Sequence, residues 1–473
     1  MNRRHFIRSA VAVAGSAVIL SPTRASGSAV ADGNGLTEPA RETPVVDDVD
    51  VIVCGAGPAG VTAAIMAARA GSKVRLLEVH GCLGGVWTAG LLSLVLDMDK
   101  PGFNQELKRR LAERSPLHNS TGYYFYDPEE MKLLLEELCA QAGVKIQLFT
   151  RVVAVQKDSA NRLTAVITES QAGRQAWRAR VFIDTTGDGN VGALADCRWE
   201  VGQAESCPCQ PMTLMGMVTI PNPGELRKSA LANSGNSMWQ EVPFENLRTE
   251  LGRVGISPSY GRPSLFHVRD RLFNLMINHE YSVLPYDSDA VTQATMRARA
   301  EVHRVVRGLR SLGGPWEGMQ LVATAEQIGI RDGRRIRGRY RVTRDDLVAG
   351  SQLPDAVTRP TYPVDIHAAT SEHNKVDGAT INKDLKMKPY DIPLRALIAA
   401  DVDGLMMAGR CISGDFTAHA SYRVTGNAVA MGEAAGVVAA LAAASRRLPH
   451  EVPWDEGASL RAKLWSQTNV IGG

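Results

Sequence analysis

The sequence is poor in the cysteine patterns that indicate a disulfide framework or a cysteine-ligated metal. Its seven cysteines are an odd number among 473 residues, and none has C-x-x-C spacing. Neither a disulfide scaffold nor a zinc or iron–sulfur site is therefore indicated, and we expect no metal site. The closest pair is Cys207 and Cys209. A bridge over so short a spacing would be strained, so we expect two free or buried thiols there, with a redox couple as the alternative.

The chain also lacks an excess of positive charge beyond its first residues. The net charge of +3 includes four arginines within residues 1–31, a stretch without acidic residues, which leaves −1 for the rest of the chain. A basic surface is the usual mark of a nucleic-acid-binding protein. We therefore expect no nucleic-acid partner.

Long hydrophobic runs are missing too. The N-terminal apolar run, residues 10–20, is shorter than the roughly 20 residues that span a membrane, and we expect no later stretch to cross one. The run follows a twin-arginine segment, residues 2–8, and precedes small residues around Ala25 and Ala31. This arrangement is similar to a Tat export signal over residues 1–31, cleaved after Ala25 or Ala31, with a retained membrane anchor as the alternative.

An export signal has consequences for partners and location. The Tat export machinery would be a partner, and the mature protein would be periplasmic or extracellular. Tat export carries folded proteins, which suits a chain that must bind a cofactor before it leaves the cytoplasm. Residues 32–48 are rich in Gly, Thr, Glu, Asp and Pro and indicate a flexible linker, so we expect the fold to begin near Val49.

Glycine is abundant, with 44 residues, and its arrangement carries the clearest signal. An apolar run from Val51 enters a G-x-G-x-x-G turn made by Gly55, Gly57 and Gly60. Gly55 permits the tight turn, Gly57 lets backbone N–H groups approach a pyrophosphate, and Gly60 lets the next helix pack closely on the sheet. The segment predicts a dinucleotide-binding fold, with the phosphates at the positive end of that helix.

The elements after this turn agree with that prediction. We expect a helix over 58–69 and a second strand over 74–77. Glu78 ends this strand 23 residues after Gly55, where a carboxylate accepts hydrogen bonds from the ribose hydroxyls of an adenosine. A 2′-phosphate at the same place would be repelled by the carboxylate.

Other glycine-rich segments follow predicted strands, at the edge where open α/β sheets bind ligands. They are the loop 80–90, the end of 179–189 and the end of 402–410. Further helices are predicted over 108–114, over 127–142 and over 426–444. The second of these begins with Asp-Pro-Glu-Glu, which supplies an N-cap, a proline in the first turn and negative charge near the positive helix end.

The middle of the chain has a different pattern. From 199 to 397 strands, amphipathic helices and polar loops alternate, and no second G-x-G-x-x-G occurs, so no separate NAD(P)H domain is indicated. We predict an α/β fold, in which a Rossmann-like domain with a parallel sheet and flanking helices is discontinuous over 49–198 and 398–446. An α+β substrate domain is inserted over 199–397, and 447–473 form a C-terminal tail.

Together the motifs resemble the FAD-dependent oxidoreductase family with the glutathione-reductase-type two-dinucleotide-binding fold, and more distantly the fumarate reductase flavoproteins. The resemblance covers roughly residues 50–445. The segments that carry it are 53–60 with Glu78, 84–85 with Thr88, 183–189, 210–213, 390–393 and 404–410. It implies that the cofactor is FAD and that the discontinuous domain binds it. We expect FAD to be held without a covalent bond, with a histidine linkage as the alternative.

The resemblance also implies which residues bind FAD. The pyrophosphate and ribose would contact Gly55, Ala56, Gly57, Ala59 and Glu78. The adenosine half would contact Val153, Thr186, Gly187 and Asp188. The flavin and its ribityl chain would contact Gly85, Gly409 and Arg410.

The segment after the last glycine motif is implied to lie beside the isoalloxazine. Thr425, Gly426 and Asn427 are candidates for a helix start whose N–H groups stabilise the negative charge of the reduced flavin. His419 titrates near neutral pH and Arg423 does not. We therefore predict His419 as a catalytic acid or base and Arg423 as the charge that orients the substrate, with a purely bracing role for both as the alternative.

Substrate contacts are least defined by the sequence. Candidates in the inserted domain are His279, Arg331, Tyr362, His367 and Arg395. The basic run 331–341 suggests an anionic substrate, although a solvated, salt-bridged face is the commoner explanation of such a run.

These observations predict an exported FAD-dependent oxidoreductase, a dehydrogenase or oxidase. It would transfer a hydride between a small organic substrate and flavin N5. Electrons would pass to a quinone, a small redox protein or dioxygen, because little nicotinamide cofactor is found outside the cytoplasm. The alternative is a flavin- or nucleotide-binding module of the same fold without redox turnover, since fold alone does not define function.

Overall fold

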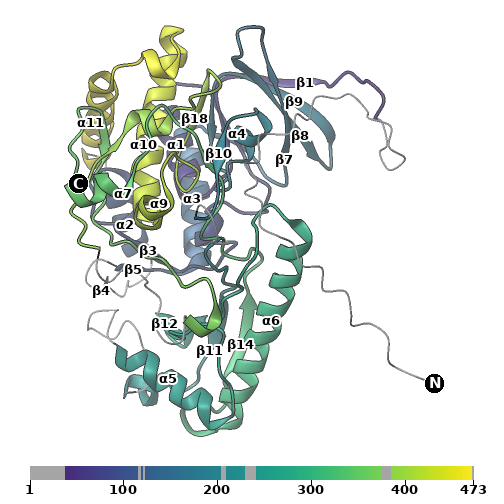
Figure 1. The fold of residues 1–473 in the computed structure, drawn as a ribbon, viewed down its shortest axis with the longest axis vertical. Coiled ribbons are helices and arrows are strands. Elements are labelled where there is room, and N and C mark those ends of the chain that lie inside the picture. Colours follow the sequence, from purple (N-terminus) through teal and green to yellow (C-terminus); the bar gives the residue numbers. More distant parts are fainter. Residues whose placement is uncertain are drawn as a thin grey trace, which may run out of the picture.

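A computed structural model describes residues 38–114, 119–120, 123–203, 209–228, 241–373 and 385–470. Figure 1 shows a larger upper part, where helices pack on a long sheet, and a smaller lower part with a second sheet and the long helix α6 (Ser288–Ser311). The predicted export signal, the first residues of the predicted linker and Cys207 lie outside the described residues.

The larger part is built on a seven-stranded sheet in the order β6–β2–β1–β9–β8–β7, with β18 also paired to β9. Its strands are β1 (Val45–Cys54), β2 (Val74–Leu77), β6 (Lys145–Gln147), β7 (Arg151–Lys157), β8 (Leu163–Ser170), β9 (Gly173–Asp184) and β18 (Leu405–Met407). β6, β2, β1, β9 and β18 are parallel, whereas β7 and β8 pair antiparallel. This parallel core with flanking helices confirms the predicted α/β class.

The first strand begins earlier than predicted. Val45 already pairs with Ala176, and Asp47 forms an ion pair with Arg75 of β2. Residues 45–48, expected in the linker, therefore belong to the sheet. The sequence did not indicate this end of β1 as a strand, because it contains polar side chains. Residues 51–54, in contrast, are fully buried, as expected for a strand covered on both faces.

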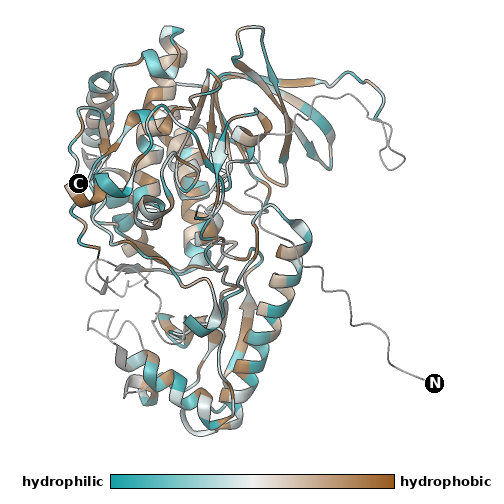
Figure 2. Cartoon of the chain, viewed as in Figure 1, coloured by the Kyte–Doolittle hydropathy of each residue, from teal (hydrophilic) through white to brown (hydrophobic). Residues whose placement is uncertain are grey.

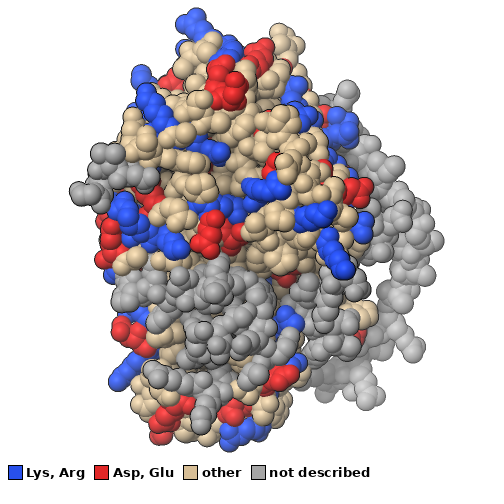
Figure 3. All heavy atoms as spheres, turned by 90° about the vertical axis from the view of Figure 1, so that its left-hand side faces the viewer, with Lys and Arg blue, Asp and Glu red and all other residues tan. Residues whose placement is uncertain are grey.

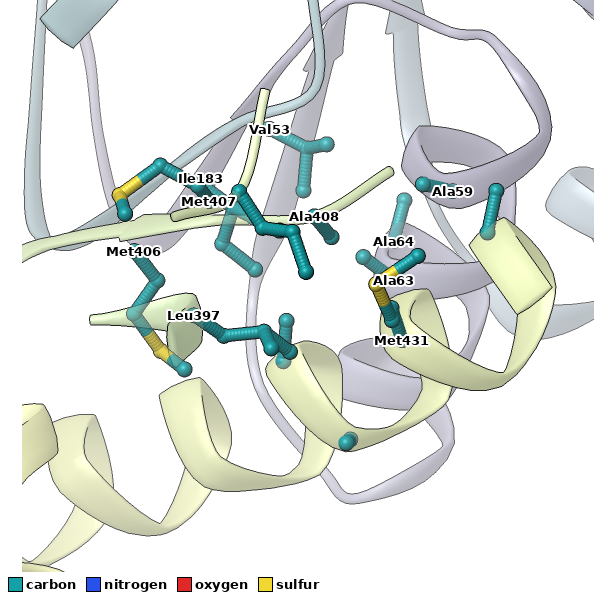
Figure 4. Close-up of a cluster of buried hydrophobic side chains, with 14 of the residues drawn as sticks. Val53, Ala59, Ala63, Ala64, Ile183, Leu397, Met406, Met407, Ala408 and Met431 are labelled. Carbon is teal, nitrogen blue, oxygen red and sulfur yellow. The ribbon is translucent and has the colours of Figure 1, made fainter. Parts of the chain in front are cut away.

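Two helices cover one face of the sheet in close contact. They are α1 (Pro58–Arg69) and α10 (Thr425–Ser445). A Cβ atom on Gly432 would lie 2.3 Å from the carbonyl oxygen of Ala59, and one on Gly436 would lie 2.4 Å from that of Ala63. Figure 4 shows Ala63 beside Met431 of α10, with Val53 of β1 nearby. Small residues thus let the two backbones touch, and this fixes α1 on the sheet.

Helix α10 requires a correction. By length and composition it is apolar enough to cross a membrane, contrary to the expectation that no later stretch would be. Of its most apolar window, 83% is buried inside the protein. Its hydrophobicity is accounted for by contact with α1, the sheet and the C-terminal helix α11 (Trp454–Val470).

Most of the other predicted elements are confirmed, with shifted ends in one case. The helices predicted over 58–69 and 127–142 are α1 and α3 (Pro128–Ala142), and the Asp127 side chain accepts a hydrogen bond from the Glu129 amide, as the capping prediction requires. The helix predicted over 108–114 is α2 (Phe103–Ala112), which starts one and a half turns earlier. The predicted C-terminal tail contains α11, whose Trp465 Nε1 donates to Glu433 Oε1 at 2.7 Å.

The smaller part has a four-stranded antiparallel sheet in the order β12–β13–β11–β14. Its elements are β11 (Gly216–Thr219), α5 (Glu241–Arg253), β12 (Ser264–Arg269), β13 (Leu272–Met276), α6 and β14 (Gln320–Thr324). Helix α6 buries Val302, Val305 and Leu309 at helical spacing, and Figure 2 shows polar and apolar residues alternating along it. These side chains and the sheet form a separate hydrophobic core.

The limits of this part are narrower than the predicted insertion, 199–397. Side chains from Ile336 to Leu397 pack into the core of the larger part, not into that of the smaller one.

The remaining elements are η1 (Gly85–Trp87), β3 (Leu94–Leu96), β4 (Asn119–Ser120), β5 (Tyr123–Phe125), α4 (Asn190–Leu194), β10 (Trp199–Glu200), η2 (Pro223–Lys228), η3 (Gly314–Trp316), β15 (Arg335–Ile336), α7 (Arg344–Ala349), β16 (Ala356–Thr358), β17 (Ile392–Pro393), η4 (Leu394–Leu397), α9 (Phe416–Tyr422) and η5 (Pro449–Glu451).

The outer surface mixes charges of both signs. On the face drawn in Figure 3, basic and acidic side chains of the described residues are interspersed. Three of the six arginines in the basic run 331–341 form ion pairs: Arg335 with Asp332, Arg339 with Asp403 and Arg341 with Glu200.

Candidate functional site

One cavity lies at the carboxyl edge of the parallel strands and extends toward the second sheet. Its wall includes residues at the ends of β1, β2, β9 and β18, among them Gly55, Glu78, Thr185 and Ala408. The carboxyl ends of parallel strands meet at one edge of a sheet, which is where open α/β folds bind ligands. The fold therefore places the glycine turns around a common space.

The cavity brings together most of the predicted site residues. Those in its wall are Gly55, Gly57, Ala59, Glu78, Gly85, Thr186, Gly187, Gly409, Arg410, Arg423 and Thr425. Those outside it are Ala56, Val153, Asp188, His419, Gly426 and Asn427. Val152, the neighbour of Val153, lines the cavity instead.

The three glycines of the first turn serve different needs. Gly55 has a φ of +98°, and a Cβ atom there would lie 2.6 Å from the carbonyl oxygen of Thr185. A Cβ atom on Gly60 would lie 1.9 Å from the carbonyl oxygen of Gly55. Gly57 has an ordinary φ of −68°, and no atom outside its immediate chain neighbourhood lies within 4 Å of its Cβ position. A side chain at Gly57 would therefore fill space in the cavity and would not clash with the protein itself.

This space fits the pyrophosphate of a dinucleotide. Gly57 is the N-cap of α1 and provides no side-chain cap, so amides of the first turn have no partner within the helix. Gly57, Pro58 and Ala59 all line the cavity at this helix end. Unpaired N–H groups and the positive end of the helix dipole attract a phosphate.

Glu78 is held in place for the ribose by two backbone amides. Its carboxylate accepts hydrogen bonds from Ala56 N at 2.5 Å and from His80 N at 2.9 Å. Ala56 thus contributes to the site by positioning Glu78 and not by lining the cavity. The Glu78 side chain is nearly buried and still lines the cavity.

The turn after β9 is organised by Asp184, which the sequence analysis did not assign. Its buried carboxylate accepts hydrogen bonds from Thr186 N at 3.1 Å, Thr186 Oγ1 at 2.7 Å and Gly192 N at 2.9 Å. Asp188 lies outside the cavity and accepts a hydrogen bond from Arg410 Nη1 at 3.0 Å. That contact holds the Arg410 guanidinium against Gly187, where a Cβ atom would meet Arg410 Nη2 at 2.5 Å.

The start of α10 forms another part of the wall. Thr425 lines the cavity, whereas Gly426 packs on the loop before α2, where a Cβ atom would lie 2.2 Å from the carbonyl oxygen of Asp97. Val424 caps the helix without a side-chain hydrogen bond. The Asn427 amide donates to Val424 O at 3.1 Å, which leaves the amides of Thr425 and Gly426 as the candidates for binding an acceptor in the cavity; their predicted contact with the flavin carbonyl stays a prediction.

A cluster of ionisable side chains lines the other end of the cavity. The cluster consists of Arg331, Asp365, His367 and Arg423. Asp365 Oδ2 lies 3.2 Å from His367 Nε2 and 3.1 Å from Arg423 Nη2. Arg331 Nη1 donates to Pro211 O at 2.7 Å and to Thr213 Oγ1 at 2.8 Å.

Burial and neighbouring charges shift the protonation of this cluster. Burial alone would raise the pKa of Asp365, but His367, Arg423 and Arg331 hold it well below its usual value. Burial lowers the pKa of His367 to about 4, although the Asp365 carboxylate raises it. At neutral pH Asp365 is therefore ionised and His367 is neutral.

Of the five predicted substrate contacts, three line the cavity and two lie outside its wall. Arg331, Tyr362 and His367 line the cavity. His279 lies outside its wall, with its ring 4.1 Å from that of Tyr260, which does line it. Arg395 is outside as well and donates from Nε to Asp355 at 2.9 Å at the surface.

The prediction for His419 needs revision. This residue on α9 is fully buried outside the cavity wall, with its ring edge-on to Tyr422 at 5.5 Å between centroids. Burial, together with Arg335, Arg423 and Arg410, lowers its pKa well below the usual value. A neutral imidazole behind the wall does not line the space that a ligand would fill, which favours the alternative, a bracing role for His419.

Sequence reasoning missed several residues at this end of the cavity. They are Asp365, Tyr260, Phe244, Phe266 and Met276. Asp365 stands two residues before His367, a spacing that could have indicated the pair. No local signal points to the apolar residues, because they reach the cavity only through the packing of the smaller part.

Replacing Gly57 by Val is expected to prevent FAD binding while the chain still folds. The new side chain would enter open space in the cavity, so it would obstruct the pyrophosphate and no protein atom. The absorbance of bound flavin in purified protein measures the loss, and far-ultraviolet circular dichroism checks the fold. Gly252→Val is the matched control, since its Cβ position is equally open but lies on α5. Full flavin loading of the Gly57→Val protein would contradict the pyrophosphate assignment.

Comparison with known proteins agrees with this geometry. The model of the family described as FAD dependent oxidoreductase matches residues 50–464. A thiamine thiazole synthase of Pyrococcus abyssi (strain GE5 / Orsay) is 30% identical over 159 residues, which are 30% of this chain and 58% of that protein. Digeranylgeranylglycerophospholipid reductase 1 of Methanopyrus kandleri is 26% identical over 229 residues, 46% of this chain and 60% of that protein. The chain thus spans less than two thirds of either relative.

Two solved structures align with most of this chain at low sequence identity. A geranylgeranyl bacteriochlorophyll reductase-like protein from Thermoplasma acidophilum aligns with a TM-score of 0.47 and 14% identity, over 90% of this chain and 84% of that one. The flavin-dependent brominase Bmp2 aligns with a TM-score of 0.47 and 11% identity, over 89% and 84%. The family model covers most of the chain, and the cavity fits its cofactor. This chain therefore belongs to the FAD-dependent oxidoreductase family, whose cofactor is FAD.

Proposed function

We propose that the protein is an exported oxidoreductase that transfers a hydride between a small organic substrate and flavin N5. The observation that carries this proposal is that one continuous cavity joins the dinucleotide-binding turns to a cluster of ionisable side chains. A module that only bound the cofactor would not need the second feature, because buried charges are costly unless they have a function or good partners.

FAD supplies the hydride chemistry when it is bound. The chain's own residues would hold and enclose it: the α1 amides and Arg410 would bind the pyrophosphate, and the first amides of α10 would be the donors to the pyrimidine carbonyl. Leu92, Leu94 and Phe266 line the same cavity and exclude water from the substrate end. Arg423 orients the substrate, and its own position is fixed by Asp365.

Proton transfer is assigned to His367 in place of His419. His367 lines the cavity, is neutral at pH 7, and has Asp365 3.2 Å from Nε2. A carboxylate in that position fixes the orientation of the ring and stabilises the imidazolium that forms when the ring takes a proton. Because Nε2 faces Asp365, the proton that a substrate loses as its hydride leaves would go to Nδ1, a buried atom without a hydrogen-bond partner among the described residues.

The electron acceptor is proposed to be a quinone, a small redox protein or dioxygen. Support for this comes from the presence of one dinucleotide fingerprint only and from the predicted export signal, which would carry the protein away from the cytoplasmic nicotinamide pool. Comparison of flavin reoxidation by dioxygen and by a soluble quinone tests it, and turnover with NAD(P)H alone would rule it out.

Export is expected to depend on Arg3 and Arg4. Changing both to Lys should keep the charge but remove the twin-arginine signal, so the protein should remain in the cytoplasm with its flavin bound. Cell fractionation followed by immunoblotting measures this. Replacing Arg24 by Lys, which lies outside the twin-arginine segment, is the control. Unchanged export of the double variant would show that the segment is not a Tat signal.

The His367→Asn variant is expected to keep its FAD and to reduce it roughly 10²-fold more slowly at pH 7, the usual size of a lost general base contribution. In the unaltered protein the rate of flavin reduction should fall as the pH drops below about 4, where His367 becomes protonated. This decrease in rate at low pH should be absent in the His367→Asn variant. Stopped-flow absorbance measures both effects. His303→Asn, at an exposed position of α6, is the control, and an unchanged rate in His367→Asn would remove the assignment.

Anaerobic mixing with candidate substrates tests the function itself. The purified protein should be yellow, and its flavin absorbance should bleach with one class of small organic compounds while dithionite sets the full extent of reduction. If no compound reduces the flavin and no reduced flavin is reoxidised by an organic acceptor, the protein is instead a flavin-binding module without turnover.

A further inference from the structure

The substrate end of the cavity carries one positive charge that the protein does not neutralise. Arg423 is paired with Asp365 at 3.1 Å, and His367 is neutral at pH 7. Arg331 donates from Nη1 to two uncharged oxygens, those of Pro211 and Thr213. Within the part of the chain that the structure describes, Arg331 has no ion pair.

The free donors of Arg331 face the cavity. Its Nε and Nη2 atoms are not among the buried polar atoms that lack a partner, and no hydrogen bond to either is present in the described residues. They are therefore accessible to a ligand in the cavity that Arg331 lines. Nε–H and one Nη2–H form the edge of a guanidinium that binds a carboxylate through two parallel hydrogen bonds.

The guanidinium is also fixed before any ligand arrives. The two hydrogen bonds from Nη1, at 2.7 and 2.8 Å, hold its plane against the segment before β11. Burial lowers the pKa of Arg331 to about 10, and the positive charge of Arg423 adds to this effect. It is nevertheless charged at neutral pH, and a buried charge without a counter-ion favours binding of an anion.

The same end of the cavity has an apolar wall. It is formed by Leu92, Leu94, Leu96, Met215, Phe244, Phe266 and Met276. Most of these belong to one hydrophobic cluster between the two parts of the molecule. Tyr260 connects this wall to the charged cluster, since its ring lies 6.0 Å from that of His367 and its amide donates to Ile277, the residue after Met276.

We propose that the substrate is a monocarboxylate with an apolar body. Its carboxylate binds the Nε and Nη2 edge of Arg331, and its body lies against Phe244, Phe266 and Met276. One negative charge neutralises the one positive charge in excess, and the apolar body displaces water from the wall. This inference rests on the proposed function, because it names the substrate class of the same site.

The proposal makes a binding prediction that needs no turnover. Acetate, butyrate, hexanoate and the uncharged hexanamide are titrated into the oxidised holoprotein, and binding is followed by the change in the visible flavin spectrum and by the rise in thermal unfolding temperature. Affinity should increase about fourfold for each added methylene group. Hexanamide should bind at least tenfold more weakly than hexanoate.

Variants at Arg331 and Met276 test the charged and the apolar half of the site separately. Arg331→Gln should lower the affinity for hexanoate at least tenfold and abolish the preference over hexanamide, while Arg331→Lys should keep that preference at reduced affinity. Met276→Trp should reduce the gain from butyrate to hexanoate to less than twofold and leave acetate binding unchanged, because the indole fills the apolar wall. Arg395→Gln removes a positive charge outside the cavity and should change nothing.

Three results would overturn the proposal. Equal binding of hexanamide and hexanoate to the unaltered protein would show that no carboxylate site exists. Undiminished binding of hexanoate to Arg331→Gln would place the site elsewhere. A lower flavin reduction potential in Arg331→Gln with unchanged hexanoate affinity would mean that Arg331 stabilises the reduced flavin and not the substrate. Because none of these measurements requires turnover, hexanoate binding to a protein that no substrate reduces would contradict the proposed function and leave only the carboxylate-binding site at Arg331 standing.

Discussion

The site depends on the contact between two backbone turns. The amide and the hydroxyl of Thr185 both donate to Cys54 O at 2.9 Å, and the hydroxyl also lies 2.6 Å from Gly55 O. The ends of β1 and β9 are thereby joined side by side, so closely that a Cβ atom at Gly55 would overlap the Thr185 carbonyl. This contact fixes the position of the N-terminus of α1 at the cavity. The packing of α10 on α1 then fixes the position of the N-terminus of α10.

A second constraint acts at the other end of the cavity. Arg423 on the segment after α9, Asp365 and His367 between β16 and β17, and Arg331 before β15 come from separate stretches of chain. Removing one partner of a buried ion pair typically costs about 3–5 kcal/mol, because the other charge remains buried. Asp365 is therefore essential to this charged cluster, because its negative charge neutralises that of Arg423, one of the two arginines at this end of the cavity. The remaining charge, on Arg331, is offset only when an anion binds, so the stability of this end and its selectivity have the same electrostatic origin.

The sequence predicted the cofactor end much better than the substrate end. Helix α1 and strand β2 have the predicted bounds, because the glycine turn and the polar residues around them act within a few residues. Gly57 was assigned from spacing alone and has the open Cβ position which that assignment requires. By contrast, His419 and His367 look alike in sequence, as single histidines near apolar residues. Only the tertiary structure distinguishes the first, behind the wall, from the second, which lines the cavity.

The same difference explains why the limits of the inserted part were misjudged. A change of local pattern at 199 is visible in the sequence, but the return of residues 336–397 to the first core follows from long-range contacts, such as the bond from Ile336 N to Cys411 O at 2.9 Å. Those residues include Asp365 and His367. Asp365 and His367 are thus mounted on the larger part, which would also hold the cofactor, whereas Phe244, Phe266 and Met276 belong to the smaller part. Changes in the packing of the smaller part would therefore alter the apolar wall while the positions of Asp365 and His367 stay fixed.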